Sequence, residues 1–141
     1  MKKLLVLAVV ATVSLSACAQ KTDAAKVPAA VKASFAKLYP GVSAKWEKED
    51  GNYEVNFKQN GNTMSVLIEP NGSIKETEMD IKVADLPATV LAYVKEHYKD
   101  KIIKEGARIT KADGTVNYEA EVGGKDVIFD ATGKFLKEAK D

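Results

Sequence analysis

Apolar residues near the start of each half of the chain recur with the period of a helix. They occupy positions 27, 31, 35 and 38, and a matching set, which ends in a histidine, occupies positions 86, 90, 94 and 97. Pro28 and Pro87 stand near the start of these sets, where a helix has no partner for the missing N–H. Tyr39-Pro40-Gly41 stops the first set, because proline cannot continue a helix. We predict one amphipathic helix in each half.

Apolar and polar residues alternate after each helix, which predicts strands with one apolar and one polar face. Four strands are predicted in the first half, at residues 42–46, 53–57 and 64–68 and from residue 74 onward. Turn signals at Asn60-Gly61 and Pro70-Asn71-Gly72 separate the later ones. The second half repeats the alternation at residues 116–122 and 127–129. The pattern predicts a four-stranded antiparallel meander after each helix.

The two halves also align residue by residue, which indicates an internal duplication. Residues 27–33 match residues 86–92 at an offset of 59, and Tyr39 then falls on Tyr98. We predict an α+β fold of two tandem repeats, residues 27–80 and 81–141, each a helix packed on a four-stranded antiparallel sheet. Units of roughly 57 residues bury only about 60% of their surface. We therefore expect the halves to pack together and to unfold in one cooperative transition.

The N-terminal segment is typical of an exported lipoprotein. A basic start at residues 1–3 precedes an apolar run at residues 4–13, which is too short to span a membrane. Leu15-Ser16-Ala17-Cys18 then resembles a bacterial lipobox. We predict a signal peptide over residues 1–17, lipidation at Cys18 and a polar tether over residues 18–26. This places the protein in the periplasm, lipid-anchored to a membrane of the cell envelope; the alternative is a plain secreted protein with a leftover cysteine.

Composition narrows the function classes. With 45% hydrophobic and 29% charged residues, the chain has the composition of an ordinary folded domain. Lys plus Arg (21) nearly balances Asp plus Glu (20), so nothing in the overall charge favours a nucleic acid partner. The only cysteine, Cys18, is the predicted lipidation site, so the single histidine has no free thiol to pair with, and no cluster of His and Cys at zinc spacing exists. We predict no enzyme activity, no cofactor and no metal site.

Three features that could carry chemistry are better explained by structure. His97 takes the helix position of Leu38 in the other repeat, which favours a histidine at the edge of the core over a catalytic base. The acidic run at residues 47–52 lacks the spacing of a calcium loop and favours a solvated hairpin. The third feature is an aromatic cluster of Trp46, Tyr53 and Phe57. The alternation of the strands places this cluster in the core rather than in a ligand site. The predicted core of the first repeat is Phe35, Trp46, Tyr53, Phe57 and Val66.

The polar faces of the predicted sheets are the candidate binding surface. Leu67 and Ile128, which the duplication aligns, both point out of this face from strands that are otherwise polar there. We predict that they are the apolar anchors of a partner-binding surface, and that a charged rim steers the partner. The predicted rim is Lys45, Lys58, Glu54 and Glu119. The alternative is that both aliphatic residues pack against the other half of the molecule or a curled strand edge.

The complete pattern resembles the PepSY-like, beta-lactamase-inhibitor-like proteins of Bacteroides-type bacteria. The resemblance covers residues 27–139 and rests on the lipobox and two copies of a helix with proline at its start, an aromatic strand and characteristic turns. In the first copy these are Trp46, Asp50-Gly51, Tyr53-Glu54 and Pro70-Asn71-Gly72. It implies a small envelope module with helices on one face of an antiparallel sheet, similar in architecture to the tandem-repeat inhibitor of beta-lactamase, and it supplies no catalytic residues.

Two functions remain open at this point. The first is a non-enzymatic, membrane-anchored periplasmic binding module that inhibits or regulates an envelope protein or peptidase, or binds a peptide. The second is a carrier or sensor that binds a small ligand between the two repeats. A cavity of a few hundred Å³ between the repeats would distinguish them, because a carrier needs one and a surface binder does not.

Overall fold

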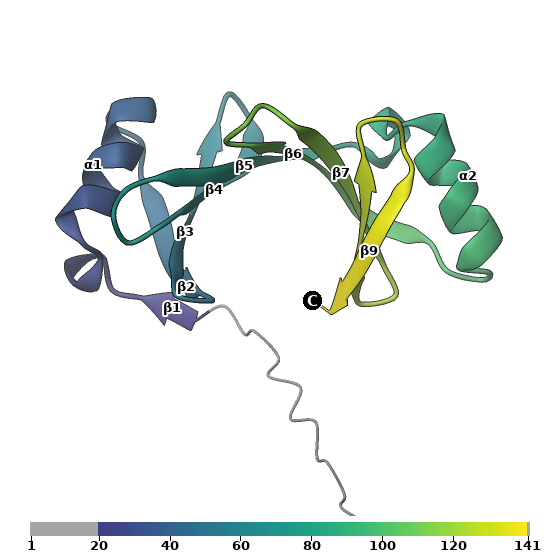
Figure 1. Cartoon of the computed structure of the whole chain (residues 1–141), viewed down its shortest axis with the longest axis horizontal. Coiled ribbons are helices and arrows are strands. Elements are labelled where there is room, and N and C mark those ends of the chain that lie inside the picture. The colour runs from purple at the N-terminus through teal and green to yellow at the C-terminus, as the bar shows by residue number, and fades with distance from the viewer. Residues whose placement is uncertain (1–19, 141) are drawn as a thin grey trace, which may run out of the picture.

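The computed structural model describes residues 20–140, and within that range the strands form one antiparallel meander (Figure 1). Every strand pairs with its neighbours in sequence order, so the sheet contains no crossover. The strands are β1 (Gln20–Thr22), β2 (Ala44–Glu49), β3 (Asn52–Gln59), β4 (Asn62–Ile68), β5 (Ile74–Ile81), β6 (Ile103–Lys111), β7 (Val116–Val122), β8 (Lys125–Asp130) and β9 (Phe135–Lys140). The sheet curves into an arch.

Two α-helices confirm the predicted duplication. Helix α1 (Ala29–Leu38) and helix α2 (Ala88–His97) begin and end at positions that are 59 residues apart. A proline directly precedes each helix, and the tyrosine that follows each one donates its backbone N–H to the carbonyl four residues earlier, 2.8 Å away in both cases. Short 3₁₀ turns, η1 (Ala24–Lys26) and η2 (Val83–Asp85), lead into the helices. Both α-helices lie on the outer side of the arch (Figure 1).

The prediction of two separate four-stranded sheets is corrected by a single continuous sheet. Strand β5 runs over eight residues and pairs with β6 of the second repeat, from Glu76 opposite Lys111 to Ile81 opposite Gly106. An unpaired β5 would expose a row of backbone N–H and C=O groups, and β6 satisfies them. The two repeats therefore share one sheet, and the helix–sheet unit of each repeat stands at one end of it.

The predicted tether does not hold from Gln20 onward. Strand β1 pairs with β2, placing Gln20 opposite Lys48 and Thr22 opposite Trp46. The Asp23 carboxylate then accepts a hydrogen bond of 3.0 Å from the backbone N–H of Ala25, which caps η1. The predicted signal peptide over residues 1–17 and the lipidation site at Cys18 lie outside the described residues.

Each helix packs on its end of the sheet over a separate core. In the first repeat Phe35, Phe57 and Val66 are buried as predicted, whereas Trp46 and Tyr53 are half-buried. The rings of Phe35 and Phe57 meet edge to face with centroids 5.1 Å apart, a favourable arrangement for aromatic pairs. The core of the second repeat is formed by Leu86, Val90, Val94, Ala120, Val122, Val127 and Phe129.

The buried stripe of each helix is shorter than predicted. Leu38 is 49% exposed and His97 is exposed as well, so neither residue is part of a core. The tyrosine that follows each helix packs against the core instead, Tyr39 in the first repeat and Tyr98 in the second. These rings cover the end of the core, and the preceding residue is left facing solvent.

A tight turn in each repeat docks onto its helix. The Ser34 hydroxyl donates a hydrogen bond of 2.7 Å to the carbonyl of Gly72, and the Thr89 hydroxyl donates one of 2.9 Å to the carbonyl of Thr132. A Cβ on Gly72 would lie 2.9 Å from the carbonyl oxygen of Ala30, and both Gly72 and Gly133 have positive φ. Only glycine fits such a position without strain.

Candidate functional site

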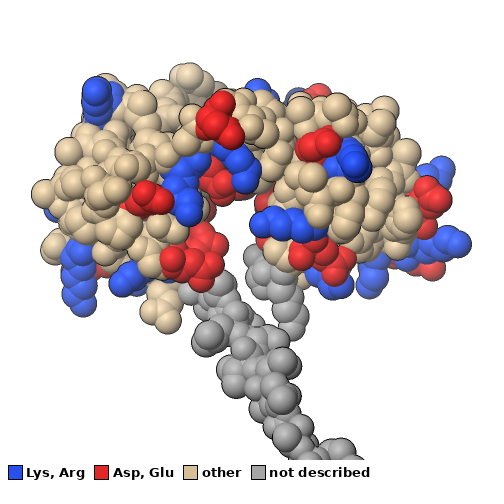
Figure 2. Space-filling view, viewed as in Figure 1, with Lys and Arg blue, Asp and Glu red and all other residues tan. Residues whose placement is uncertain are grey.

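The inner side of the arch is a sheet face that neither helix covers; we call it the concave face (Figure 1). Figure 2 shows that it is hollowed and lined by charged side chains. Because cross-strand partners point to the same side of a sheet, the strand register identifies its residues. One row across it consists of Lys21, Glu47, Glu54, Leu67, Glu76 and Lys111, and a second row of Lys45, Asn56, Ser65, Glu78, Ile109, Asn117 and Asp130.

The register brings all six predicted partner-binding residues onto this face. Glu54 lies directly opposite Leu67 in the first repeat, and Glu119 lies directly opposite Ile128 in the second. The two lysines lie nearer one end of the first repeat, where Lys45 is opposite Asn56 and Lys58 is opposite Thr63.

The prediction that Leu67 and Ile128 are equally exposed is wrong for Ile128. Leu67 is half-buried, whereas Ile128 is only 7% exposed. Ala107 and Ile109 on β6 and Asn117 on β7 are buried on the same face. Curvature draws side chains together on the inner side of a sheet, and this crowding buries the aliphatic residues of the second repeat. The burial of Ile128 favours the alternative, in which it packs against the other half of the molecule or a curled strand edge, over a role as an exposed anchor.

Carboxylates dominate the concave face of the first repeat. Burial raises the pKa of Glu78 to about 7, and the carboxylates of Glu54, Asp80, Glu76 and Asp126 add to the effect. Burial also raises the pKa of Glu54, although hydrogen bonds from Ser65 and Asn56 act in the opposite direction. Burial and neighbouring carboxylates raise the pKa of Glu49 as well. Ionising these three carboxylates is therefore less favourable than it is in water.

Two carboxylates of the second repeat have cationic partners, Glu121 on the concave face and Glu138 on the helix side of the sheet. The ammonium group of Lys104 lies 3.1 Å from the Glu121 carboxylate, and that of Lys125 lies 2.5 Å from the Glu138 carboxylate. Glu138 also accepts a hydrogen bond from the Tyr98 hydroxyl, and burial together with this bond raises the pKa of Tyr98 to about 12. The ion pair and this hydrogen bond lower the pKa of Glu138.

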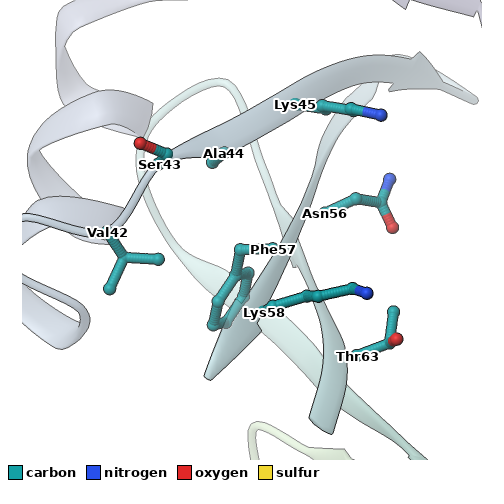
Figure 3. Close-up of a pocket in the computed structure, with 8 residues that line it drawn as sticks. All are labelled: Val42, Ser43, Ala44, Lys45, Asn56, Phe57, Lys58 and Thr63. Carbon is teal, nitrogen blue, oxygen red and sulfur yellow. The ribbon is translucent and has the colours of Figure 1, made fainter. Parts of the chain in front are cut away.

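An open pocket of about 590 Å³ lies at one end of β2, β3 and β4 (Figure 3). Its walls combine polar side chains of the concave face with Val42 and Phe57 of the helix-side core. The lining residues are Val42, Ser43, Ala44, Lys45, Asn56, Phe57, Lys58 and Thr63. All belong to the first repeat, so this pocket is not the cavity between the repeats that a carrier would need.

The other features considered from sequence lie away from the concave face or at its rim. His97 stacks on Tyr93 with ring centroids 4.1 Å apart, on helix α2 at the outer side of the arch. Residues 47–52 form the predicted hairpin, in which Asp50 and Gly51 both have positive φ, as a type I′ turn requires. Among residues 20–140, no group of three or more acidic, histidine or cysteine side chains is placed to hold a metal ion. Over the same range, both α-helices are too short to cross a bilayer.

Sequence reasoning missed the acidic residues of β5. Glu76, Glu78 and Asp80 alternate with Thr77, Met79 and Ile81, and this alternation is visible in the sequence. The prediction placed only the start of a short fourth strand, at residue 74, so these carboxylates had no assigned face. Their pairing with β6 places them at the centre of the arch.

Comparisons with known proteins agree with this architecture. A family described as "putative beta-lactamase-inhibitor-like, PepSY-like" matches residues 15–76 and again residues 68–137. No curated protein sequence matches significantly.

Solved structures from Bacteroides share the fold. A putative periplasmic protein from Bacteroides eggerthii is 18% identical, with a TM-score of 0.70 over 81% of this chain and 88% of that one. A DUF2874 family protein from Bacteroides ovatus is 24% identical, with a TM-score of 0.67 over 80% and 86%. A BLIP-like protein from Bacteroides fragilis is 23% identical, with a TM-score of 0.59 over 80% and 86%.

Proposed function

We propose that this chain, which belongs to the PepSY-like, beta-lactamase-inhibitor-like family, is a non-enzymatic binding module of the cell envelope that inhibits or regulates a partner protein. The observation that carries the proposal is the concave face, a sheet surface that both helices leave uncovered. Protein interfaces combine a partly apolar centre with a polar rim. Leu67, half-buried among charged residues, provides such a centre in the first repeat.

The chemistry of the concave face supports binding rather than catalysis. A hydrolase needs a nucleophile within reach of a base that is itself oriented by a third group. The Ser65 hydroxyl on the concave face donates a hydrogen bond to the Glu54 carboxylate. The single histidine, His97, lies on α2 on the opposite side of the sheet. These neighbours suit a surface that orients a partner by charge and hydrogen bonding.

The proposed location is the periplasm, with a lipid anchor at Cys18. The solved structures with this fold include proteins described as putative periplasmic proteins, and the lipobox supports export and lipidation. The described structure begins with strand β1 at Gln20, and two residues span at most about 7 Å. Strand β1 lies near the open end of the arch (Figure 1). An anchored module would therefore hold its opening close to the membrane surface.

The anchor is tested by Cys18→Ser. The variant should move to the soluble fraction or accumulate unprocessed, because the sequence contains no other cysteine to receive a lipid. Wild-type processing together with wild-type membrane association would overturn this part of the proposal.

The binding face is tested by photocrosslinking in intact cells. A photoreactive phenylalanine analogue at Thr63, exposed on the concave face, should yield a specific adduct. The same analogue at Lys32, exposed on α1, serves as the matched control and should yield none. Adducts from Lys32 alone, or none from Thr63, would contradict the proposed face.

A further inference from the structure

We infer that the partner presents a lysine or arginine side chain, carried on a basic surface segment, to Leu67 and the carboxylates around it. This inference rests on the proposed function and names the chemistry of the partner at the same face. Its basis is an uncovered sheet face with one half-buried aliphatic residue, Leu67, whose direct cross-strand neighbours both carry carboxylates. We call this group the acidic cradle; it consists of Glu54, Leu67, Glu76 and Glu78.

The strand register fixes the shape of the cradle. Glu54 on β3 and Glu76 on β5 are the direct cross-strand partners of Leu67 on β4. Neighbouring strands lie about 4.8 Å apart, so the two carboxylate-bearing residues flank the leucine at nearly 10 Å from each other. Glu78 is opposite Ser65, two residues further along the same strands and on the same face. The acidic cradle therefore has an aliphatic floor, Leu67, with carboxylates on two sides.

A long cationic side chain fits this arrangement. Lysine and arginine combine an apolar stem with a charged end, so the stem can cover Leu67 while the ammonium or guanidinium group reaches a carboxylate. A neutral side chain would leave the carboxylates without a counter-charge. An anionic group, including a lipid phosphate, would be repelled by them. Charge complementarity therefore favours a basic protein segment over the membrane surface.

The carboxylates of the acidic cradle have no cationic partner in the part of the chain that the structure describes. Among the described residues, no ion pair within 4.0 Å involves Glu54, Glu76 or Glu78. The lysines of the same row stand at its two ends, Lys21 on β1 and Lys111 on β6. Burial is the main cause of the raised pKa values of Glu54 and Glu78, and neighbouring carboxylates raise both pKa values further. A cation from the partner would relieve the repulsion, and this relief favours binding.

The inference is tested with a defined probe. A fluorescent ten-residue peptide of alternating lysine and threonine is titrated into the full-length protein in detergent at low salt, with a glutamate–threonine peptide as the charge-reversed control. The lysine peptide should bind and the glutamate peptide should not. The double variant Glu54→Gln and Glu76→Gln should bind the lysine peptide at least about 10-fold more weakly, because it loses both charges that flank Leu67.

A control variant separates the cradle from overall charge. Asp85→Asn combined with Glu96→Gln removes two negative charges from η2 and α2, away from the concave face, and should bind the lysine peptide as the wild type does. Equal losses in the two double variants, no binding of the lysine peptide, or stronger binding to phosphatidylglycerol vesicles would each overturn the inference. If a Thr63 adduct forms but the lysine peptide does not bind, the proposed function stands and this inference alone fails.

A pH titration gives a second readout. The groups that face Glu78 are Glu54, Glu76, Asp80 and Asp126, with uncharged Ser65 and Ile109 on the adjoining strands. Protonation of Glu78 below pH 7 removes one negative charge, so affinity for the lysine peptide should fall several-fold between pH 8 and pH 6. Glu78→Gln should flatten this dependence, and an unchanged dependence in that variant would contradict a role for Glu78 in the cradle.

Discussion

The two repeats are nearly the same on their outer side and differ on their inner side. Each has a ten-residue helix after a proline, a tyrosine that closes the core, and a glycine turn hydrogen-bonded to the helix. On the concave face, however, the first repeat carries carboxylates around a half-buried leucine, and Glu54, Glu76 and Glu78 form no ion pair with any residue in the range 20–140. The second repeat buries Ala107, Ile109 and Ile128 there.

The difference shows which side of the sheet the fold constrains. The outer side must pack against a helix, and both repeats keep apolar residues in the helix and strands and a turn bonded to the helix for it. The inner side has no helix to satisfy, so its residues can diverge. In this chain the inner surface of the second repeat contains buried residues, whereas that of the first repeat is open and charged.

The largest expected effects test the equivalence of the two cores. Phe57→Ala and Phe129→Ala should each lower the free energy of unfolding by about 3–5 kcal/mol, because both rings are buried against a helix. Urea denaturation measures both. A loss below about 1 kcal/mol for either residue would show that the two cores are not equivalent.

Because one sheet joins the repeats, calorimetry of the wild type should show a single unfolding transition. Two separated transitions would contradict that coupling.

The next comparison concerns the inner face. Ile128→Ala should cost about 2–5 kcal/mol as a buried large-to-small change, whereas Leu67→Ala should cost only about 1 kcal/mol because Leu67 is half-exposed to solvent. The same urea experiment decides it. Equal costs would mean that the inner faces of the two repeats are packed alike.

The docked turns give a smaller and well-controlled effect. Gly133→Ala should cost at least about 2 kcal/mol, because the residue has positive φ and its Cβ would lie 2.8 Å from the Thr89 Cβ. Gly114→Ala is the control: it has the same strain and no atom within 4 Å, so about 1 kcal/mol is expected. If both variants lose the same stability in thermal unfolding, the contact between turn and helix contributes nothing.

The concave carboxylates should also shape the pH dependence of stability. The pKa of Glu78 is about 7 in the folded protein and near 4.5 when unfolded, so the folded state binds more protons between these values. Its contribution therefore makes the wild type less stable as the pH rises from about 4.5 to 7. Glu78→Gln should gain about 1–3 kcal/mol over the wild type at pH 8 and nothing near pH 4. An equal gain at both pH values would show that ionisation is not the cause.

Much of the outer side was predictable from sequence. The helices follow from the spacing of apolar residues and from the prolines, and the turns follow from their glycine and asparagine signals. The offset of 59 residues predicts that the second repeat has the same helix as the first, and the structure has both. Even the misplaced ends of the buried stripes, Leu38 and His97, are errors of one residue, because the following tyrosine takes their place in the core.

The inner side was not predictable to the same degree, because it depends on long-range pairing. Alternation correctly assigned Leu67 and Ile128 to the polar face, but their burial depends on how far each part of the sheet curves. The joining of β5 to β6 is likewise a contact between repeats, and it decides that Glu78 lies at the centre of the arch. No local pattern in the sequence specifies either property.

The central claim is that the open concave face of the first repeat is the binding surface. The most direct test is a methyl NMR titration of the protein with the lysine–threonine peptide. The methyl signals of Leu67 should shift, while those of Val31 and Val90, buried beneath the two helices, should stay in place. Shifts at Val31 or Val90 with an unchanged Leu67 would place binding on the helical side and contradict the account.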